Sequence, residues 1–193
     1  MELEKIAAGA VLTEEHLRSR AAAYIPLGEK VKFLNAVSMR CFDQMEIADE
    51  NGEPLPPFYK DSPVSKLKYM TAALLKLYLR LGFDTEREDD PWSITEESFD
   101  AAAQSFLFSQ LERMKKRTAD KGLQDKIYDL LADYKALEKL LNAECYGMLP
   151  AMNDTVSRFQ MMMAAQTTPE AMDALMKSVE ETKRELEAFK AAK

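Results

Sequence analysis

Apolar residues recur at spacings of three and four along much of the chain, which is the period of an amphipathic helix. The first clear stripe is made by Leu27, Val31, Leu34, Val37, Cys41 and Met45. Pro26 stands just before it, and a proline at that place separates this helix from a shorter one. The shorter helix is expected over about residues 13–23, with Thr13 as its N-cap.

The segment between Ser62 and Gly82 is apolar on almost every face. Ser62 and Pro63 suit the N-cap and the first turn of a helix, and Gly82 suits its C-terminal end. The apolar positions are Val64, Leu67, Met70, Leu74, Leu75, Leu77, Tyr78, Leu79 and Leu81. A helix without a polar face is typical of a buried position, so we expect this helix at the centre of a bundle.

Two heptad-like patterns follow in the C-terminal part of the chain. The first is made by Ile127, Leu130, Tyr134, Leu137 and Leu141, which repeat as the a and d positions of a coiled coil. We expect Gly147 and Pro150 to end this helix, and a short segment to follow over about residues 154–165. A last helix begins at Thr168–Pro169, with proposed oligomerisation residues Met172, Leu175, Val179, Leu186 and Phe189. The spacing leaves open whether these helices pair with each other or with a second chain.

The stretch between residues 45 and 63 is expected to be a loop. Asn51–Gly52 is the strongest turn signal in the chain. Three prolines at positions 54–57 limit any hairpin around that turn to a short one.

These patterns predict an all-α fold, a multi-helix bundle with long, heptad-like C-terminal helices. Residues 1–120 are expected to form an N-terminal helical bundle that carries an acidic loop at 84–95. Residues 121–193 are expected to form a helical hairpin or a coiled-coil-like arm, unless the whole chain is one continuous domain.

Composition favours long helices with few turns. The chain has 193 residues, of which 47% are hydrophobic and 31% charged, with only 6 Gly and 8 Pro. Cys41 and Cys145 form no CxxC pair, so we expect buried, reduced thiols, with a disulfide between them as the less favoured alternative. Residues 1–12 have no signal-peptide pattern, and no apolar run approaches the roughly 20 residues of a membrane span. We expect a cytoplasmic protein without membrane contact.

Charge is distributed unevenly. The acids between residues 84 and 100 are Asp84, Glu86, Glu88, Asp89, Asp90, Glu96, Glu97 and Asp100. Arg87 is the only base among them, so this segment accounts for the net charge of −7 and the remaining chain is neutral. A neutral body with one acidic segment is not the electrostatic pattern of a nucleic-acid-binding protein.

A helix capped by Ser93 or Thr95 is expected to follow the acidic loop and to extend to about Arg117.

The chain offers little material for catalysis. His16 is the only histidine and is expected on the surface, and no second histidine or cysteine pair completes a zinc site. The sequence contains no phosphate-binding glycine loop and no nucleophile elbow. Asp84, Glu86 and Glu88 alternate as in an EF-hand, but Asp89 stands where that loop needs glycine. We therefore predict a protein without enzymatic activity, cofactor or metal.

The acidic segment is the candidate contact surface for a protein with a basic surface. Trp92 is the only tryptophan, and tryptophan is enriched among the residues that dominate interfaces. The candidate partner-binding residues are Asp84, Glu86, Glu88, Asp89, Asp90, Trp92, Glu96 and Glu97. The alternative is that Trp92 packs onto the following helix and that the acids only keep the loop soluble.

Three segments of the chain resemble uncharacterised proteins of phages and prophages of gut bacteria. They include Tyr24-Ile25-Pro26-Leu27, Leu55-Pro56-Pro57 and Tyr146-Gly147-Met148. The resemblance spans most of the chain and transfers no functional residue. It implies a non-enzymatic, phage-encoded inhibitor of a bacterial defence nuclease, similar to anti-CRISPR proteins, which here would act through the acidic surface. The alternative that it implies is a virion assembly or connector component that oligomerises through its C-terminal helices.

Overall fold

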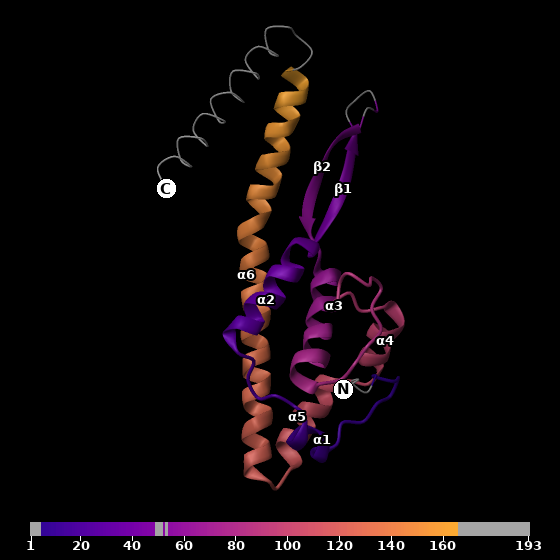
Figure 1. The fold of residues 1–193 in the computed structure, drawn as a ribbon, viewed down its shortest axis with the longest axis vertical. Helices are drawn as coiled ribbons and strands as arrows, with labels where there is room; N and C mark the ends of the chain where they lie inside the picture. The colour runs from indigo at the N-terminus through magenta and orange to yellow at the C-terminus, as the bar shows by residue number, and fades with distance from the viewer. Residues whose placement is uncertain (1–4, 49–51, 53, 166–193) are drawn as a thin grey trace. The chain divides into compact units, whose positions relative to one another are not determined.

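The computed structural model describes residues 5–48, 52 and 54–165. These residues fall into two compact units (Figure 1): residues 5–43 and 61–147 form the first, and the described parts of 44–60 and 148–165 form the second. In chain order the elements are α1 (Glu14–Ser19), α2 (Leu27–Val37), the 3₁₀ turn η1 (Ser38–Arg40), β1 (Phe42–Ala48), β2 (Pro54–Asp61), α3 (Pro63–Ala73), the π-helical segment η2 (Leu74–Leu79), α4 (Glu96–Gln104), α5 (Leu107–Arg117) and α6 (Lys121–Ala165).

The all-α prediction is wrong, because β1 and β2 form a hairpin. The two strands pair antiparallel in a two-stranded sheet, so the fold is mixed helix and sheet. Both strands of such a ribbon are edge strands, where proline is tolerated because only one side of each strand carries ladder hydrogen bonds. The three prolines at positions 54–57 lie within β2 and do not prevent it from pairing with β1. At the turn, Gly52 has a φ of +82°, the left-handed backbone that favours glycine.

In the second unit, the side chain of Asn153 on α6 binds the backbone of β2. The N–H of Tyr59 donates to Asn153 Oδ1 at 3.0 Å, and Asn153 Nδ2 donates to the carbonyl of Tyr59 at 3.1 Å. One amide therefore satisfies both polar backbone groups of a residue on the strand edge, where another strand could otherwise pair.

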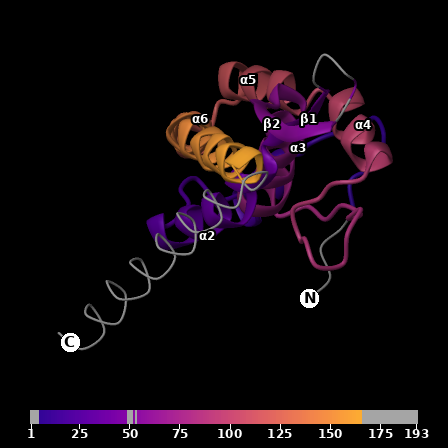
Figure 2. The same cartoon turned by 90° about the horizontal axis from the view of Figure 1, so that it is seen from above.

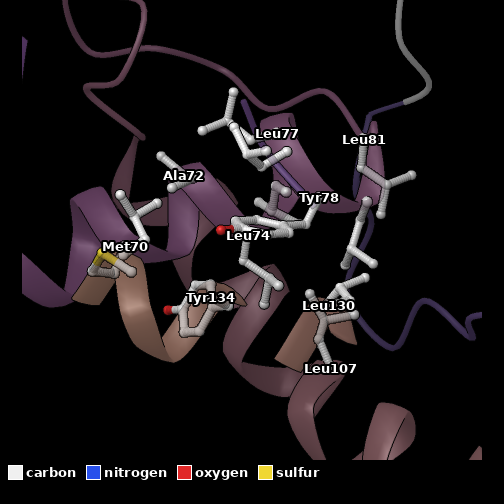
Figure 3. Close-up of a cluster of buried hydrophobic side chains, with 14 of the residues drawn as sticks. Met70, Ala72, Leu74, Leu77, Tyr78, Leu81, Leu107, Leu130 and Tyr134 are labelled. Carbon is white, nitrogen blue, oxygen red and sulfur yellow. The ribbon is translucent and has the colours of Figure 1, made fainter. Parts of the chain in front are cut away.

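The first unit is built around the apolar segment that begins at Pro63, as the sequence predicted. Ser62 caps it by accepting a hydrogen bond from the N–H of Ser65 at 3.4 Å. Figure 1 and Figure 2 both show α3 between α6 and α4. Its continuation η2 has five buried apolar side chains, which belong to one core cluster with Leu107 of α5 and Leu130 of α6. Figure 3 shows three of the five, Leu74, Leu77 and Tyr78, within this cluster.

The helix ends at Leu79, three residues before the predicted Gly82. Arg80 adopts the left-handed conformation with a φ of 55°, and the N–H of Leu81 donates to the carbonyl of Leu75 at 2.9 Å. His16 lies at this end: its Nε2 is 2.6 Å from the carbonyl oxygen of Leu79. The histidine expected on the surface is therefore half-buried against an open helix end.

Helix α6 is longer than the sequence predicted. Gly147 and Pro150 do not end it, and Pro150 lies inside it. A proline removes one N–H, and a helix this long persists through that loss. The five heptad-like residues from Ile127 to Leu141 are all buried in the core of the first unit. This corrects the coiled-coil interpretation, because the stripe packs against helices of its own chain. Neither α6 nor any other helix among the described residues is long and apolar enough to cross a membrane.

The last expected helix, after Thr168–Pro169, lies outside the described residues. So do the proposed oligomerisation residues Met172, Leu175, Val179, Leu186 and Phe189. The expected boundary after residue 120 falls between α5 and α6, inside the first unit. The two-domain organisation stays a prediction.

Helix α2 buries only part of the predicted stripe. Val37 is buried, whereas Leu27 and Val31, two other residues of the stripe, are 63% and 43% exposed. The other buried side chains of this helix are Phe33 and Lys30, which lie outside the predicted stripe.

Asp133 of α6 explains the buried lysine. Its carboxylate forms an ion pair with Lys30, and both side chains are at most 10% exposed. The same carboxylate accepts hydrogen bonds from the hydroxyl of Tyr78 at 2.9 Å and from the N–H of Ile25 at 3.0 Å. A buried lysine is stable only when its charge is paired in this way.

The two cysteines are buried in the first unit, as the sequence predicted, and both are free thiols. Cys41 Sγ donates to the carbonyl of Val37 at 3.3 Å, and Cys145 Sγ lies 3.8 Å from the carbonyl of Ser38. Burial raises the pKa of both thiols. They therefore remain protonated and serve as small core side chains.

Candidate functional site

The acidic loop, residues 84–95, connects the segment after η2 to α4. Its two ends are joined by backbone hydrogen bonds, from the N–H of Glu86 to the carbonyl of Ser93 at 2.6 Å and from the N–H of Thr95 to the carbonyl of Asp84 at 2.9 Å. Ser93 Oγ also donates to the carbonyl of Asp90 at 2.8 Å. The loop is therefore closed on itself by its own hydrogen bonds.

Asp90 anchors this loop to the body of the first unit. It is the buried member of the eight acids between residues 84 and 100, with a side chain that is 1% exposed. Its carboxylate pairs with Arg40 of η1 and accepts hydrogen bonds from the hydroxyl of Tyr69 at 3.2 Å and the N–H of Trp92 at 3.0 Å. Burial and the charge of Asp90 raise the pKa of Tyr69 to about 12, so the phenol keeps the proton that it donates.

The Trp92 ring is half-buried beneath the loop. It meets Phe33 of α2 edge to face, with ring centroids 5.0 Å apart. Lys76 Nζ lies 4.8 Å from the indole centroid and donates to the carbonyl of Pro91 at 3.1 Å. Burial lowers the pKa of Lys76. The tryptophan therefore packs against α2 and η2, whereas the alternative interpretation expected α4.

The other seven acids of the segment are exposed, and four of them form ion pairs. The pairs are Lys5–Asp84 (2.5 Å), Lys68–Glu86 (3.3 Å), Lys68–Glu96 (2.5 Å) and Arg87–Asp89 (2.9 Å). A hydrogen bond from Arg87 holds the pKa of Asp89 below its usual value. Across the described part of the chain, no ion pair involves Glu88, Glu97 or Asp100.

Helix α4 begins directly after the loop. Thr95, one of the two expected caps, accepts a hydrogen bond from the N–H of Ser98 at 3.2 Å. Glu96 and Glu97 occupy the first turn, where the helix dipole favours acids. The helix expected to reach Arg117 is instead two helices, because the chain breaks at Phe106, whose φ is 48°.

The arrangement offers charge but no evident reactive group. Within the described residues, no three side chains of His, Cys, Asp or Glu are placed to hold a metal ion. Two of the acids that alternate as in an EF-hand, Asp84 and Glu86, contact Lys5 and Lys68 instead. The exposed carboxylates are suited to electrostatic contact with a cationic surface.

Sequence reasoning missed the residues that hold the loop in place. Arg40, Tyr69 and Lys76 are 15 to 50 residues from the loop contacts they make. No local spacing connects them to it, and Asp90 cannot be told from Asp89 by sequence. The only signal in the sequence was the high density of acidic residues. It located the acidic segment but did not identify Asp90 as its buried anchor.

No protein-family model, curated protein or solved structure matches this chain. The resemblance to phage and prophage proteins stays a prediction, and so does the inhibition of a defence nuclease that it implies.

Proposed function

We propose that this protein binds another protein through its acidic loop, and that the partner presents a basic surface. The observation that carries the proposal is the buried anchor Asp90, which ties the loop to Arg40 and Tyr69 while seven neighbouring acids face solvent. A surface ordered in advance loses little conformational entropy when a partner binds. A loop whose acids served only solubility would need no such anchor.

The exposed ion pairs do not prevent this use of the surface. Lys5 and Asp84 are 66% and 58% exposed, and exposed pairs contribute little to stability, so they exchange easily for partner groups. Glu88 and Glu97 carry no ion pair within the described part of the chain and would meet the partner directly. The Trp92 ring is half-buried against the body of the first unit, so carboxylates rather than the indole make most of the contact with the partner.

The test is a charge reversal that spares the anchor. Glu86, Glu88 and Asp89 are replaced by Lys, while Asp90 and the Thr95 cap stay intact. The full-length chain, immobilised, is incubated with a bacterial lysate at about 50 and 300 mM salt, where screening differs strongly. We expect a protein retained by the wild type to be lost by the variant and weakened by the higher salt.

A matched control changes the same number of charges elsewhere. Asp125, Asp129 and Glu144 are exposed acids of α6, and their replacement by Lys should leave retention unchanged. Equal retention by the loop variant and the wild type at both salt concentrations would contradict the proposal.

The alternative function, assembly of a larger particle, depends on the C-terminal residues from Met172 to Phe189. Those residues lie outside the described part of the chain. No observation here favours this alternative, and it stays a prediction.

A further inference from the structure

The two cysteines of the chain meet in the core of the first unit. Cys41 follows η1, Cys145 lies on α6, and both are 0% exposed. The N–H of Cys41 donates to the carbonyl of Ser38 at 3.2 Å, and Cys145 Sγ lies 3.8 Å from the same oxygen. The two thiols also interact with each other through a side-chain hydrogen bond. Two residues far apart in the sequence therefore have their sulfur atoms side by side.

Two thiols in contact are the reduced form of a disulfide. The other common use of paired thiols is zinc binding, which needs further His, Cys or carboxylate ligands. In the part of the chain that the structure describes, neither Cys41 nor Cys145 belongs to a group that could hold a metal ion. Disulfide formation needs no further ligand, only the loss of two protons and two electrons.

The surroundings distinguish the two sulfur atoms. Burial raises the pKa of both thiols, and the charge of Lys66 on α3 lowers both. The hydrogen bond between the thiols raises the pKa of Cys41 and lowers that of Cys145. Cys145 is therefore the better attacking sulfur, and Cys41 is placed to react with it. Because burial keeps both thiols protonated, their reaction waits for brief local opening and is slow.

We propose that Cys41 and Cys145 are a peroxide-sensitive dithiol that closes to an intramolecular disulfide. The Cys145 thiol loses its proton and attacks one oxygen of hydrogen peroxide. The O–O bond breaks, and the departing hydroxide takes up that proton as water. The sulfur of Cys41 then attacks the sulfenic acid on Cys145, the S–O bond breaks, and the departing hydroxide takes the Cys41 proton. One peroxide is reduced to two waters while two thiols are oxidised to one disulfide, which small thiols reopen by exchange.

The disulfide would tie η1 to α6 within the first unit. The chain segments of this unit end at Asp43 and Gly147, so each cysteine stands two residues before the chain passes to the second unit. A bond between them closes a loop of about 100 residues and restricts the unfolded chain. The oxidised protein should therefore unfold at a higher temperature, and the stability of the first unit would follow the redox conditions.

The first test oxidises the folded, full-length protein. Protein reduced with dithiothreitol and freed of it is exposed to hydrogen peroxide, then denatured and alkylated. We expect neither cysteine to take up the reagent, a linked Cys41–Cys145 peptide in the digest, and a rise in Tm of about 5–10 °C that dithiothreitol reverses. Two alkylated cysteines after peroxide treatment, or a disulfide that joins two chains, would overturn the proposal.

A second test removes the barrier of burial. Full-length protein unfolded in urea is refolded with oxidised and reduced glutathione, so that both thiols meet the oxidant before the core closes. We expect the same disulfide, the same gain in Tm and the wild-type emission of Trp92. A native fold with two free thiols would show that the sulfur atoms are not placed to bond. A disulfide formed in this test alone would show that the folded pair does not respond to peroxide, which also contradicts the proposal.

Single variants assign the roles of the two sulfur atoms. Neither Cys41→Ser nor Cys145→Ser should gain in Tm on peroxide treatment relative to its own reduced form. Both keep the 12 methionines, so they also control for methionine oxidation. In Cys41→Ser the sulfenic acid on Cys145 should persist and react with dimedone, several-fold more than Cys41 does in Cys145→Ser. A gain in Tm in either variant equal to that of the wild type would show that the disulfide is not its cause.

Discussion

Two buried aspartates in the first unit have the same kinds of partner and do different work. Asp133 binds the ammonium of Lys30, the hydroxyl of Tyr78 and a backbone N–H. Asp90 likewise binds a cation, a tyrosine hydroxyl and a backbone N–H, from Arg40, Tyr69 and Trp92. A buried carboxylate needs this number of donors because each unpaired lone pair is costly away from water.

The difference lies in the cation. Lys30 is 7% exposed, so it loses nearly all hydration and depends on Asp133 for its charge balance. Arg40 is 33% exposed and keeps part of its contact with water. The Asp133 network therefore holds the core, where α2, η2 and α6 meet, whereas the Asp90 network holds a surface loop in a defined shape. One chemical design thus serves stability in one place and presentation of a surface in the other.

The largest effect is expected at Asp133. Asp133→Ala leaves the charge of Lys30 buried without a partner and removes the acceptor for Tyr78. Breaking a buried pair from one side costs about 3–5 kcal/mol, so the free energy of unfolding in urea should fall by that amount. Asp129→Ala, an exposed acid one turn earlier on α6, should change it by no more than about 0.5 kcal/mol.

A double variant separates the cost of the unpaired Lys30 charge from the cost of the lost hydrogen bonds. Replacing Lys30 by Met together with Asp133 by Leu removes both charges, which leaves only the polar groups of Tyr78 and Ile25 unpaired. The loss in the free energy of unfolding should then be only about 1–3 kcal/mol. If Asp133→Ala alone costs less than about 1 kcal/mol, the network does not hold the core, and the contrast with Asp90 is wrong.

A smaller loss is expected at Asp90. Asp90→Ala should cost about 2 kcal/mol, because Arg40 can turn towards water when its partner is removed. The sharper readout is local. Trp92 is the only tryptophan, so its fluorescence should shift to the red as the loop loosens and water reaches the indole.

The exposed neighbour provides the control for this variant. Asp89→Ala should leave both the stability and the emission of Trp92 close to wild type. An unchanged spectrum in Asp90→Ala would mean that the loop keeps its shape without the anchor, and the proposed presentation of the acidic surface would lose its basis.

Residue spacing located most of the helices but not the fold class, because the hairpin of β1 and β2 makes the fold mixed rather than all-α. The helix after Ser62 was placed at the centre because it has no polar face, and Leu74 in that helix is 2% exposed. The heptad-like stripe of α6 is buried, but it packs against helices of its own chain, and spacing alone could not distinguish this from pairing with a second chain. The buried face of α2 was predicted only in part: Val37 was assigned correctly, but Lys30 was missed because a pattern of polar and apolar residues treats every lysine as exposed. Only Asp133, about 100 residues away, makes Lys30 a core residue.

The candidate site was less accessible to sequence reasoning. The density of acids located the loop, yet the buried and exposed members of that group are the same residue type in adjacent positions. Burial of Asp90 depends on Arg40 and Tyr69, which tertiary folding brings to it. The predicted hairpin was short at best, because three prolines limit strand pairing. Prolines limit a central strand far more than an edge strand, and both strands of this hairpin are edge strands.

The smallest effect concerns the tyrosine of the loop anchor. Burial and the charge of Asp90 raise the pKa of Tyr69 from its ordinary value of 10.0 to about 12 in the folded protein. A raised folded-state pKa means that the protonated phenol stabilises the fold. The contribution is complete below about pH 10 and is lost as the pH rises towards 12. Because the side chain is only partly buried, we expect about 1 kcal/mol.

The measurement compares the wild type with Tyr69→Phe in urea at about pH 8 and pH 11. At the lower pH the wild type should be more stable by about 1 kcal/mol, and the gap should narrow at the higher pH because the unfolded wild type gains stability by releasing the phenol proton. The difference in absorbance at about 295 nm between the two proteins should report a single tyrosine that ionises near pH 12. A transition near pH 10 in that difference would show that the Tyr69 hydroxyl is not held by Asp90, and would leave Arg40 as the main partner of the loop anchor.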